Sequence, residues 1–133
     1  MLEPEYNHTM KTKVLVISKI GSSRYALIKN HLNQLGVTFE VSPAVFLSGE
    51  CPWTIEYNSI RRKKIFGFDM TKSEVGCFLA HREAWASVVK SNQVTLIIED
   101  DARLMPQLLN VLDELSKTIE NTDIILRLFS VHH

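Results

Sequence analysis

The chain has 133 residues, the size of one domain, and its 15 basic and 15 acidic side chains give a formal net charge of zero. A neutral chain lacks the overall field that favours nucleic acid, and no apolar run approaches the roughly 20 residues that span a bilayer. Because the two cysteines, Cys51 and Cys77, show no metal-ligand spacing, we expect a reduced, cytoplasmic compartment.

The first third of the chain predicts a β-α-β unit. Residues 1–12 form a polar leader, and residues 13–18 read Lys-Val-Leu-Val-Ile-Ser, a short buried strand. Apolar residues then recur at steps of four and three through residues 24–35, which predicts an amphipathic helix that Gly36 ends. Apolar and polar residues alternate strictly through residues 37–41, which predicts a second strand.

Residues 42–70 are irregular and contain the basic run Arg-Arg-Lys-Lys at residues 61–64. A long connection of this kind in a compact domain often has a function. The basic run could attract a diphosphate, an anionic acceptor or lipid headgroups, or it could be a solvated charged face.

The second half of the chain predicts two helices and two strands. Residues 71–74 read Thr-Lys-Ser-Glu, a capping box that predicts a helix to about residue 90. Residues 94–98 predict a buried strand, Pro106 begins another helix, and residues 123–129 predict a fourth strand. The order of these elements implies an α/β, Rossmann-like fold with a mostly parallel sheet flanked by helices.

Three consecutive acids, Glu99, Asp100 and Asp101, follow the buried strand at residues 94–98. Crowded carboxylates repel one another, and a cation cancels that repulsion. If the extended conformation continues, Glu99 and Asp101 share one side and Asp100 points away, which predicts two oxygen ligands for Mg²⁺ or Mn²⁺. The alternative is a solvated turn. Ligands of parallel sheets bind at the carboxyl ends of strands, so we expect Ser18 and the acids to face one crevice.

An ordered set of motifs resembles glycosyltransferase family 25, the bacterial lipooligosaccharide glycosyltransferases and their collagen galactosyltransferase relatives. Residues 74–81 resemble the family's Gly-Cys-x-x-Ser-His helix, and residues 96–102 resemble its acidic motif. Further matches lie at residues 14–18, 23–24, 35–37, 44–45 and 123–126. The sequence departs from the pattern at Phe46, where an Asp is expected, and at Ala80, which replaces the Ser before His81.

The resemblance implies a GT-A-like fold in which residues 13–133 are the nucleotide-sugar-binding part and which continues beyond His133. It implies transfer of a sugar, often galactose, from a UDP-sugar to a lipooligosaccharide or other glycan, at the cytoplasmic face of the inner membrane. Glu99 and Asp101 would hold a divalent Mn²⁺ or Mg²⁺ ion that stabilises the departing UDP. The residues expected at the donor are Ile17, Ser18, Arg24, His81 and Asp100.

Each of these residues also has a structural interpretation. His81 could be a core-edge histidine satisfied by a neighbouring carbonyl, Arg24 could decorate a helix, and Ser18 could merely finish a strand. Two other functions stay open. One is a truncated remnant that at most binds UDP-sugar. The other is a receiver-like signalling domain, because Ile-Ile-Glu-Asp-Asp resembles the first acidic strand of response regulators, although 98 residues precede Glu99 here.

Overall fold

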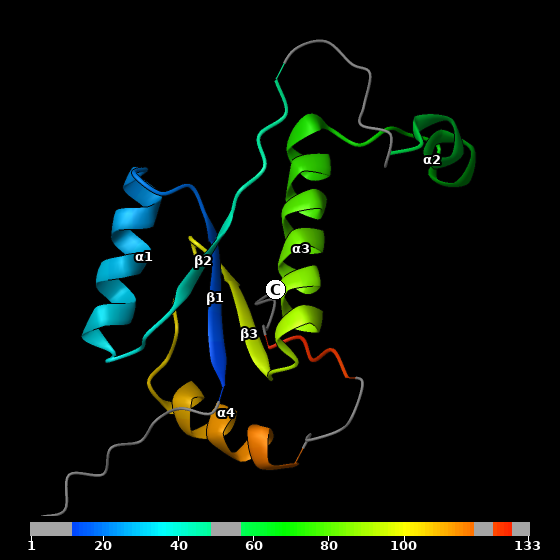
Figure 1. The fold of residues 1–133 in the computed structure, drawn as a ribbon. Helices are drawn as coiled ribbons and strands as arrows, with labels where there is room; N and C mark the ends of the chain where they lie inside the picture. The colour runs from blue at the N-terminus through cyan, green and yellow to red at the C-terminus, as the bar shows by residue number, and fades with distance from the viewer. Residues whose placement is uncertain (1–11, 49–56, 119–123, 129–133) are drawn as a thin grey trace, which may run out of the picture.

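The computed structural model describes residues 12–48, 57–118 and 124–128 (Figure 1). The fold is mixed α/β, as predicted, with a parallel sheet between helices. Among the residues that the structure describes, no helix combines the length and the hydropathy needed to cross a membrane.

The sheet has three parallel strands in the order β2-β1-β3. The central strand β1 (Lys13–Ser18) pairs with β2 (Glu40–Pro43) on one side and β3 (Thr95–Glu99) on the other. The register aligns Ile17 with Glu99, so the carboxyl ends of β1 and β3 lie side by side. This edge of the sheet is where the serine and the acids meet.

Side chains alternate along β1 and so feed two cores, one on each face of the sheet. Val14 and Val16 pack with residues of α1 (Ser23–Gln34) and α4 (Gln107–Thr118). The opposite face of the sheet packs against α3 (Lys72–Ser91), and Figure 1 shows α1 and α3 on opposite sides of β1. The predicted helices therefore form, and they cover both faces.

Two helix starts follow directly from the sequence. Ser22 caps α1 by accepting a hydrogen bond from the backbone N–H of Tyr25. Thr71 and Glu74 form the predicted capping box at the start of α3, each side chain accepting a hydrogen bond from the other's backbone N–H. The capping box fixes where α3 begins, and hence the faces on which its later residues lie.

The second strand lies three residues later than residues 37–41 predict. Gly36 has a positive φ of 68° and, at the next residue, the Val37 N–H donates to the carbonyl of Leu32 at 2.9 Å. This is a helix-termination bond of the Schellman type. Val37 is therefore bound to the end of α1 and buried with it, and the chain reaches β1 only at Glu40.

The predicted fourth strand is wrong for the part that can be compared. Residues 124–128 have no regular secondary structure, and residues 123 and 129 lie outside the described residues. All five are exposed, with Ile125 at 83%. A run of apolar residues becomes a buried strand only where a neighbouring strand and a covering layer are available. Within the described part of the chain the sheet consists of β2, β1 and β3, and residues 124–128 pair with none of these strands.

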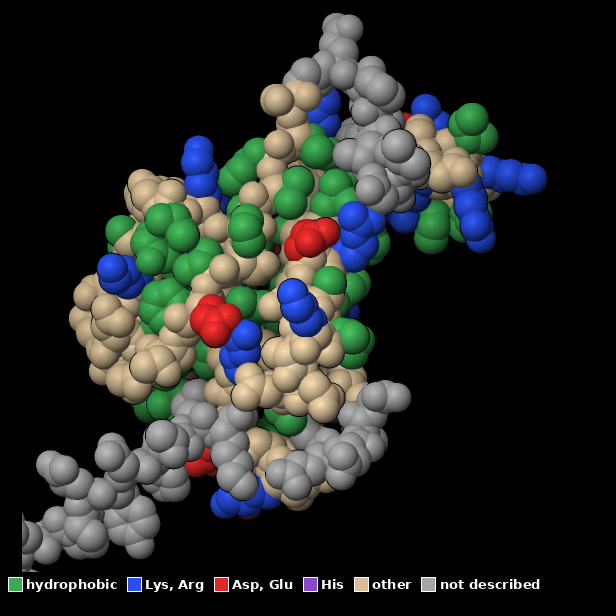
Figure 2. All heavy atoms as spheres, viewed as in Figure 1, with side chains coloured by type: hydrophobic (Ala, Val, Ile, Leu, Met, Phe, Trp, Pro, Cys, Tyr) green, Lys and Arg blue, Asp and Glu red, His purple; other side chains and the backbone are tan. Residues whose placement is uncertain are grey.

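The irregular region contains a helix that the sequence did not locate, α2 (Ser59–Phe66). Asp69 ties its start to the following turn, since Ser59 Oγ and Tyr57 Oη donate to its carboxylate and Lys63 pairs with it at 3.4 Å. The hydrogen bonds from Ser59 and Tyr57 lower the pKa of Asp69 to about 2. Figure 2 shows basic side chains gathered over α2, which projects from the sheet.

Candidate functional site

The carboxyl ends of β1 and β3 are joined by a direct side-chain contact. Ser18 is the last residue of β1 and is only 1% exposed. Its Oγ donates a hydrogen bond of 2.8 Å to Oδ2 of Asp100, which follows β3. This contact confirms that the serine and the acids lie at one edge of the sheet. It also binds Ser18 to Asp100, which goes beyond a role in finishing the strand.

Asp100 and Asp101 do not continue the strand. The chain turns after Glu99, and the N–H of Ala102 donates to the Glu99 carbonyl at 3.1 Å. The condition for placing Glu99 and Asp101 on one side is therefore not met: Asp100 and Asp101 both contact Arg24, whereas Glu99 contacts Cys77. Strict alternation holds only while the backbone stays extended, and it ends at the last strand residue.

A cation already lies between the two aspartates. Arg24, in the first turn of α1, places Nε 3.2 Å from Asp100 Oδ1 and Nη2 3.1 Å from Asp101 Oδ2. The predicted need for a cation beside the acids is met by this guanidinium. Arg24 is 60% exposed, so its head can leave the aspartates at small cost when a stronger anion is present.

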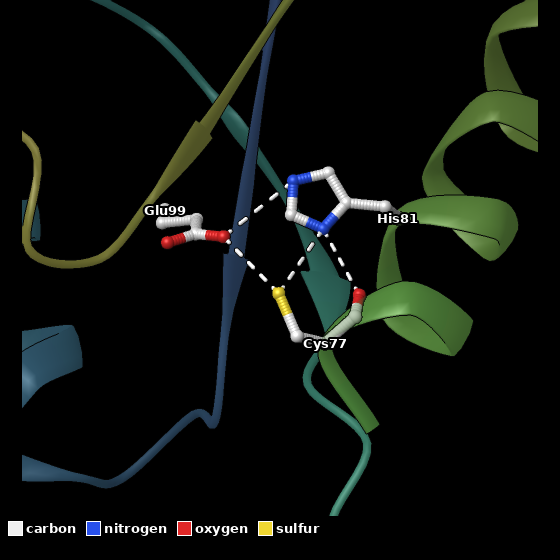
Figure 3. Close-up of side chains that lie close together, drawn as sticks. All are labelled: Cys77, His81 and Glu99. Atoms are coloured by element: carbon white, nitrogen blue, oxygen red, sulfur yellow. Dashed lines mark hydrogen bonds and ion pairs between the residues drawn. The ribbon is translucent and has the colours of Figure 1, made fainter. Parts of the chain in front are cut away.

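Glu99, at the end of β3, faces a different set of side chains, which lie on α3. Figure 3 shows the Glu99 carboxylate facing Cys77 and His81. Glu99 Oε1 lies 3.4 Å from Cys77 Sγ and 3.5 Å from His81 Nε2. Cys77 and His81 are four residues apart, so they lie on the same face of the helix. We call these three residues the Cys77–His81–Glu99 cluster.

His81 has the neighbouring carbonyl that its structural interpretation expects, and its ring also faces an acid. Its Nδ1 lies 3.0 Å from the carbonyl oxygen of Cys77, one helical turn earlier, and a carbonyl only accepts, so Nδ1 carries the proton. The ring is thus held by a neighbouring carbonyl and also points Nε2 at an acid. In the neutral ring this leaves Nε2 as an acceptor facing a carboxylate, which also accepts.

The thiol of Cys77 is not set up as a nucleophile. Partial burial, and then the hydrogen bond to Glu99, raise the pKa of the Cys77 thiol. Reactive cysteines need the opposite shift, because the thiolate is the attacking form. Metal binding is the other use of such a thiol, and the spacing between the two cysteines does not indicate it. The signal that could have revealed it is the Cys-x-x-x-His spacing on one helical face.

Ile17 and the two positions that depart from the family pattern, Phe46 and Ala80, differ in burial. Ile17 is buried and packs with Ala80 and Ala84, so it supports the site from beneath. Ala80 is itself in that core, and His81 is still held by its carbonyl bond. Phe46 is exposed, with Lys19 Nζ 5.7 Å from the centre of its ring. The roles of Ile17, Ser18, Arg24, His81 and Asp100 in donor binding stay predictions.

A sequence model of glycosyltransferase family 25 (LPS biosynthesis protein) matches residues 11–133. The chain belongs to glycosyltransferase family 25. The membership confirms the resemblance found in the motifs, supports a glycosyltransferase, and removes the reason for the receiver-like interpretation.

Several animal proteins of the family are similar to this chain. A procollagen galactosyltransferase 2 of Mus musculus is 33% identical over 73 residues, which are 54% of this chain and 12% of that protein. A glycosyltransferase 25 family member of Aedes aegypti is 34% identical over 85 residues, 58% of this chain and 14% of that protein. Procollagen galactosyltransferase 2 of Homo sapiens is 38% identical over 55 residues, 41% of this chain and 8% of that protein.

The chain therefore covers only about a tenth of the length of these relatives. No solved structure matches the chain significantly. The sequence match establishes the family.

Proposed function

We propose that this chain binds UDP-galactose at the carboxyl ends of β1 and β3 and takes part in galactosyl transfer to a glycan. The match of family 25 over residues 11–133 is the observation that carries the proposal. Two of the similar proteins are named as galactosyltransferases, which supports galactose as the sugar. The place fits, because ligands of parallel sheets bind outside the carboxyl ends of strands.

Arg24 is the residue that we assign to the donor diphosphate. Its guanidinium matches the paired oxygens of phosphate groups, and it is exposed at the first turn of α1. In the absence of donor it rests on Asp100 and Asp101. A diphosphate carries more charge than either carboxylate, so it draws Arg24 away and leaves Asp101 open.

The acids then have two separate tasks. Asp100 stays bound to the buried Ser18 hydroxyl and holds the turn in place. Glu99 and Asp101 are the residues that we propose for a divalent ion, Mn²⁺ or Mg²⁺, which when bound supplies charge stabilisation to the leaving UDP. Their fit is partial before donor binding, because Asp101 is paired with Arg24 and Glu99 faces Cys77 and His81. Both ions fit this assignment, because carboxylate oxygens suit Mn²⁺ and Mg²⁺ alike.

The acceptor that we propose is a lipooligosaccharide, in line with the family's description as LPS biosynthesis protein. The surface of α2 supports contact with an anionic membrane that carries such an acceptor. Residues 61–64 are basic, and Ile60, Ile65 and Phe66 on the same helix are exposed. Basic and apolar side chains together favour binding at an anionic lipid surface, so a cytoplasmic protein at the inner face of the membrane is part of this proposal.

Calorimetry with UDP-galactose, once with Mn²⁺ and once with EDTA, tests the donor. We expect binding that Mn²⁺ strengthens and that Arg24→Gln weakens about 10-fold, the loss expected for charge-assisted hydrogen bonds. Lys29→Gln is the matched control, because it removes the same charge from α1 and should leave the affinity unchanged. Absence of binding in both conditions would refute the proposal.

A transfer assay tests the reaction itself. Galactose from labelled UDP-galactose should appear on lipooligosaccharide and not on a procollagen peptide. The reverse preference would contradict the proposed acceptor. Donor binding without transfer to either would favour the alternative in which this chain only binds UDP-sugar.

A further inference from the structure

The structure assigns a second role to the end of β3: we propose that Cys77, His81 and Glu99 form a zinc site. This site goes beyond the proposed function, because it needs no sugar donor. Its three side chains offer one sulfur, one nitrogen and one oxygen atom, all within 4.8 Å of one another (Figure 3).

The spacing of the donor atoms fits a tetrahedral ion. With zinc bonds of about 2.3 Å to sulfur and about 2.0 Å to nitrogen or oxygen, tetrahedral angles place neighbouring ligand atoms roughly 3.3–3.5 Å apart. Glu99 Oε1 is 3.4 Å from Cys77 Sγ and 3.5 Å from His81 Nε2. Two edges of the coordination polyhedron are therefore already formed.

The histidine is oriented as zinc ligands are. Its Nδ1 donates to the Cys77 carbonyl at 3.0 Å, which leaves Nε2 as the metal-binding nitrogen, and Nε2 lies 3.5 Å from Glu99 Oε1. Metal-binding histidines usually donate their other ring N–H to a carbonyl or carboxylate in this way. An ion between Nε2 and Oε1 also removes the unfavourable contact between two acceptors.

The backbone places the three ligands on well-defined elements. Cys77 and His81 lie one turn apart on α3, whose start is fixed by the Thr71–Glu74 capping box. Glu99 is the last residue of β3, in register with Ile17 of the central strand. The site therefore bridges a helix and a strand, and zinc would link the two.

The chemistry of the ligands selects the metal. A thiolate with an imidazole and a carboxylate suits Zn²⁺, whereas Mg²⁺ requires oxygen ligands. Binding releases the thiol proton to solvent, because the thiolate is the form that coordinates. Three protein ligands leave a fourth position for water or substrate. Glu99 contributes Oε1 here and has a second oxygen for the proposed donor metal, so the two ions share this carboxylate.

The test is titration of the EDTA-treated chain with Zn²⁺ alone, followed by Co²⁺ substitution. We expect one zinc per chain, no comparable binding of Mg²⁺, and a cobalt spectrum with a thiolate charge-transfer band and tetrahedral d–d bands. Cys77→Ser should remove the charge-transfer band and weaken zinc binding at least about 10-fold, and His81→Gln should weaken it similarly.

Cys51→Ser is the matched control, because Cys51 is the other cysteine of the chain and should leave zinc binding and the cobalt band unchanged. Circular dichroism of each variant establishes that it is folded. Absence of zinc binding by the folded chain would overturn the proposal, and so would unchanged binding in folded Cys77→Ser. The outcome is separate from the donor test, because zinc binding is measured without UDP-galactose.

Discussion

Glu99 and Asp100 are neighbours in the chain, yet they belong to two different regions of the molecule. Asp100 is 16% exposed and is held by the buried Ser18 and by Arg24 of α1. Glu99 is 47% exposed and faces Cys77 and His81 of α3. The sheet lies between those two helices, so a single turn of the backbone sends consecutive acids to opposite covering layers.

The two regions therefore differ in what their acids do. The Asp100 region is already neutralised by an arginine and is tied to a buried hydroxyl, so it stabilises the fold. The Cys77–His81–Glu99 cluster is accessible and holds two facing acceptors, so it is ready for an ion. Substitutions should separate the effects of the two regions. The free energy of unfolding of the metal-free chain measures how much the Asp100 region stabilises the fold.

The largest effect is expected at Gly76, which precedes the cluster. A Cβ at this position would lie 2.4 Å from the carbonyl oxygen of Val45, so Gly76→Ala must push α3 away from the chain that follows β2. Overpacking of this kind costs about 1–3 kcal/mol, which urea unfolding measures. The same shift moves Cys77, so zinc affinity should fall while the Ser18–Asp100 contact survives. Unchanged stability would show that α3 can move freely.

The next largest effect is expected at Asp100. Asp100→Ala leaves the buried Ser18 hydroxyl without its acceptor and should cost about 1–3 kcal/mol in urea unfolding. Asp100→Asn keeps an acceptor oxygen for Ser18 and should recover part of the loss. Zinc affinity should stay near that of the unchanged chain in both. A fall in zinc affinity equal to that of Cys77→Ser would show that the Asp100 region and the Cys77–His81–Glu99 cluster are not independent.

A smaller loss is expected at Arg24. Its ion pairs with Asp100 and Asp101 are exposed, so Arg24→Gln should cost at most about 1 kcal/mol of unfolding free energy. The loss should shrink further at high salt, because exposed charges are screened. Urea unfolding at low and high salt measures both. A cost equal to that of Asp100→Ala would show that Arg24, and not Ser18, secures the turn.

The smallest change in stability is expected at Glu99. Glu99→Gln removes a half-exposed charge whose contacts with Cys77 Sγ and His81 Nε2 are long, at 3.4 and 3.5 Å. The free energy of unfolding of the metal-free chain should therefore change by about 0.5 kcal/mol or less. Zinc should nevertheless stabilise the unchanged chain in a thermal melt and fail to stabilise this variant, because a ligand that binds only the folded state raises its stability. Equal zinc stabilisation of both proteins would remove Glu99 from the site.

Much of the fold could be predicted because its signals are local. Strand β1 is a short apolar run, the start of α3 is a capping box, and the period of 3.6 residues marks α1. The errors occurred where a segment depends on distant partners. Residues 124–128 have the composition of a strand but lie exposed. The N–H of Val37 is hydrogen-bonded to the end of α1, so β2 begins only at Glu40.

The family, the α/β class and the position of the acids at the end of a buried strand can be predicted from the amino-acid sequence, because motif order and apolar runs are properties of neighbouring residues. The partner of each acid depends on how the chain folds. Arg24 and Cys77 are far from the triplet in the chain, and the parallel sheet brings each to its own side of the strand end. The physical reason is the turn after Glu99: it ends the alternation and divides the acids between α1 and α3.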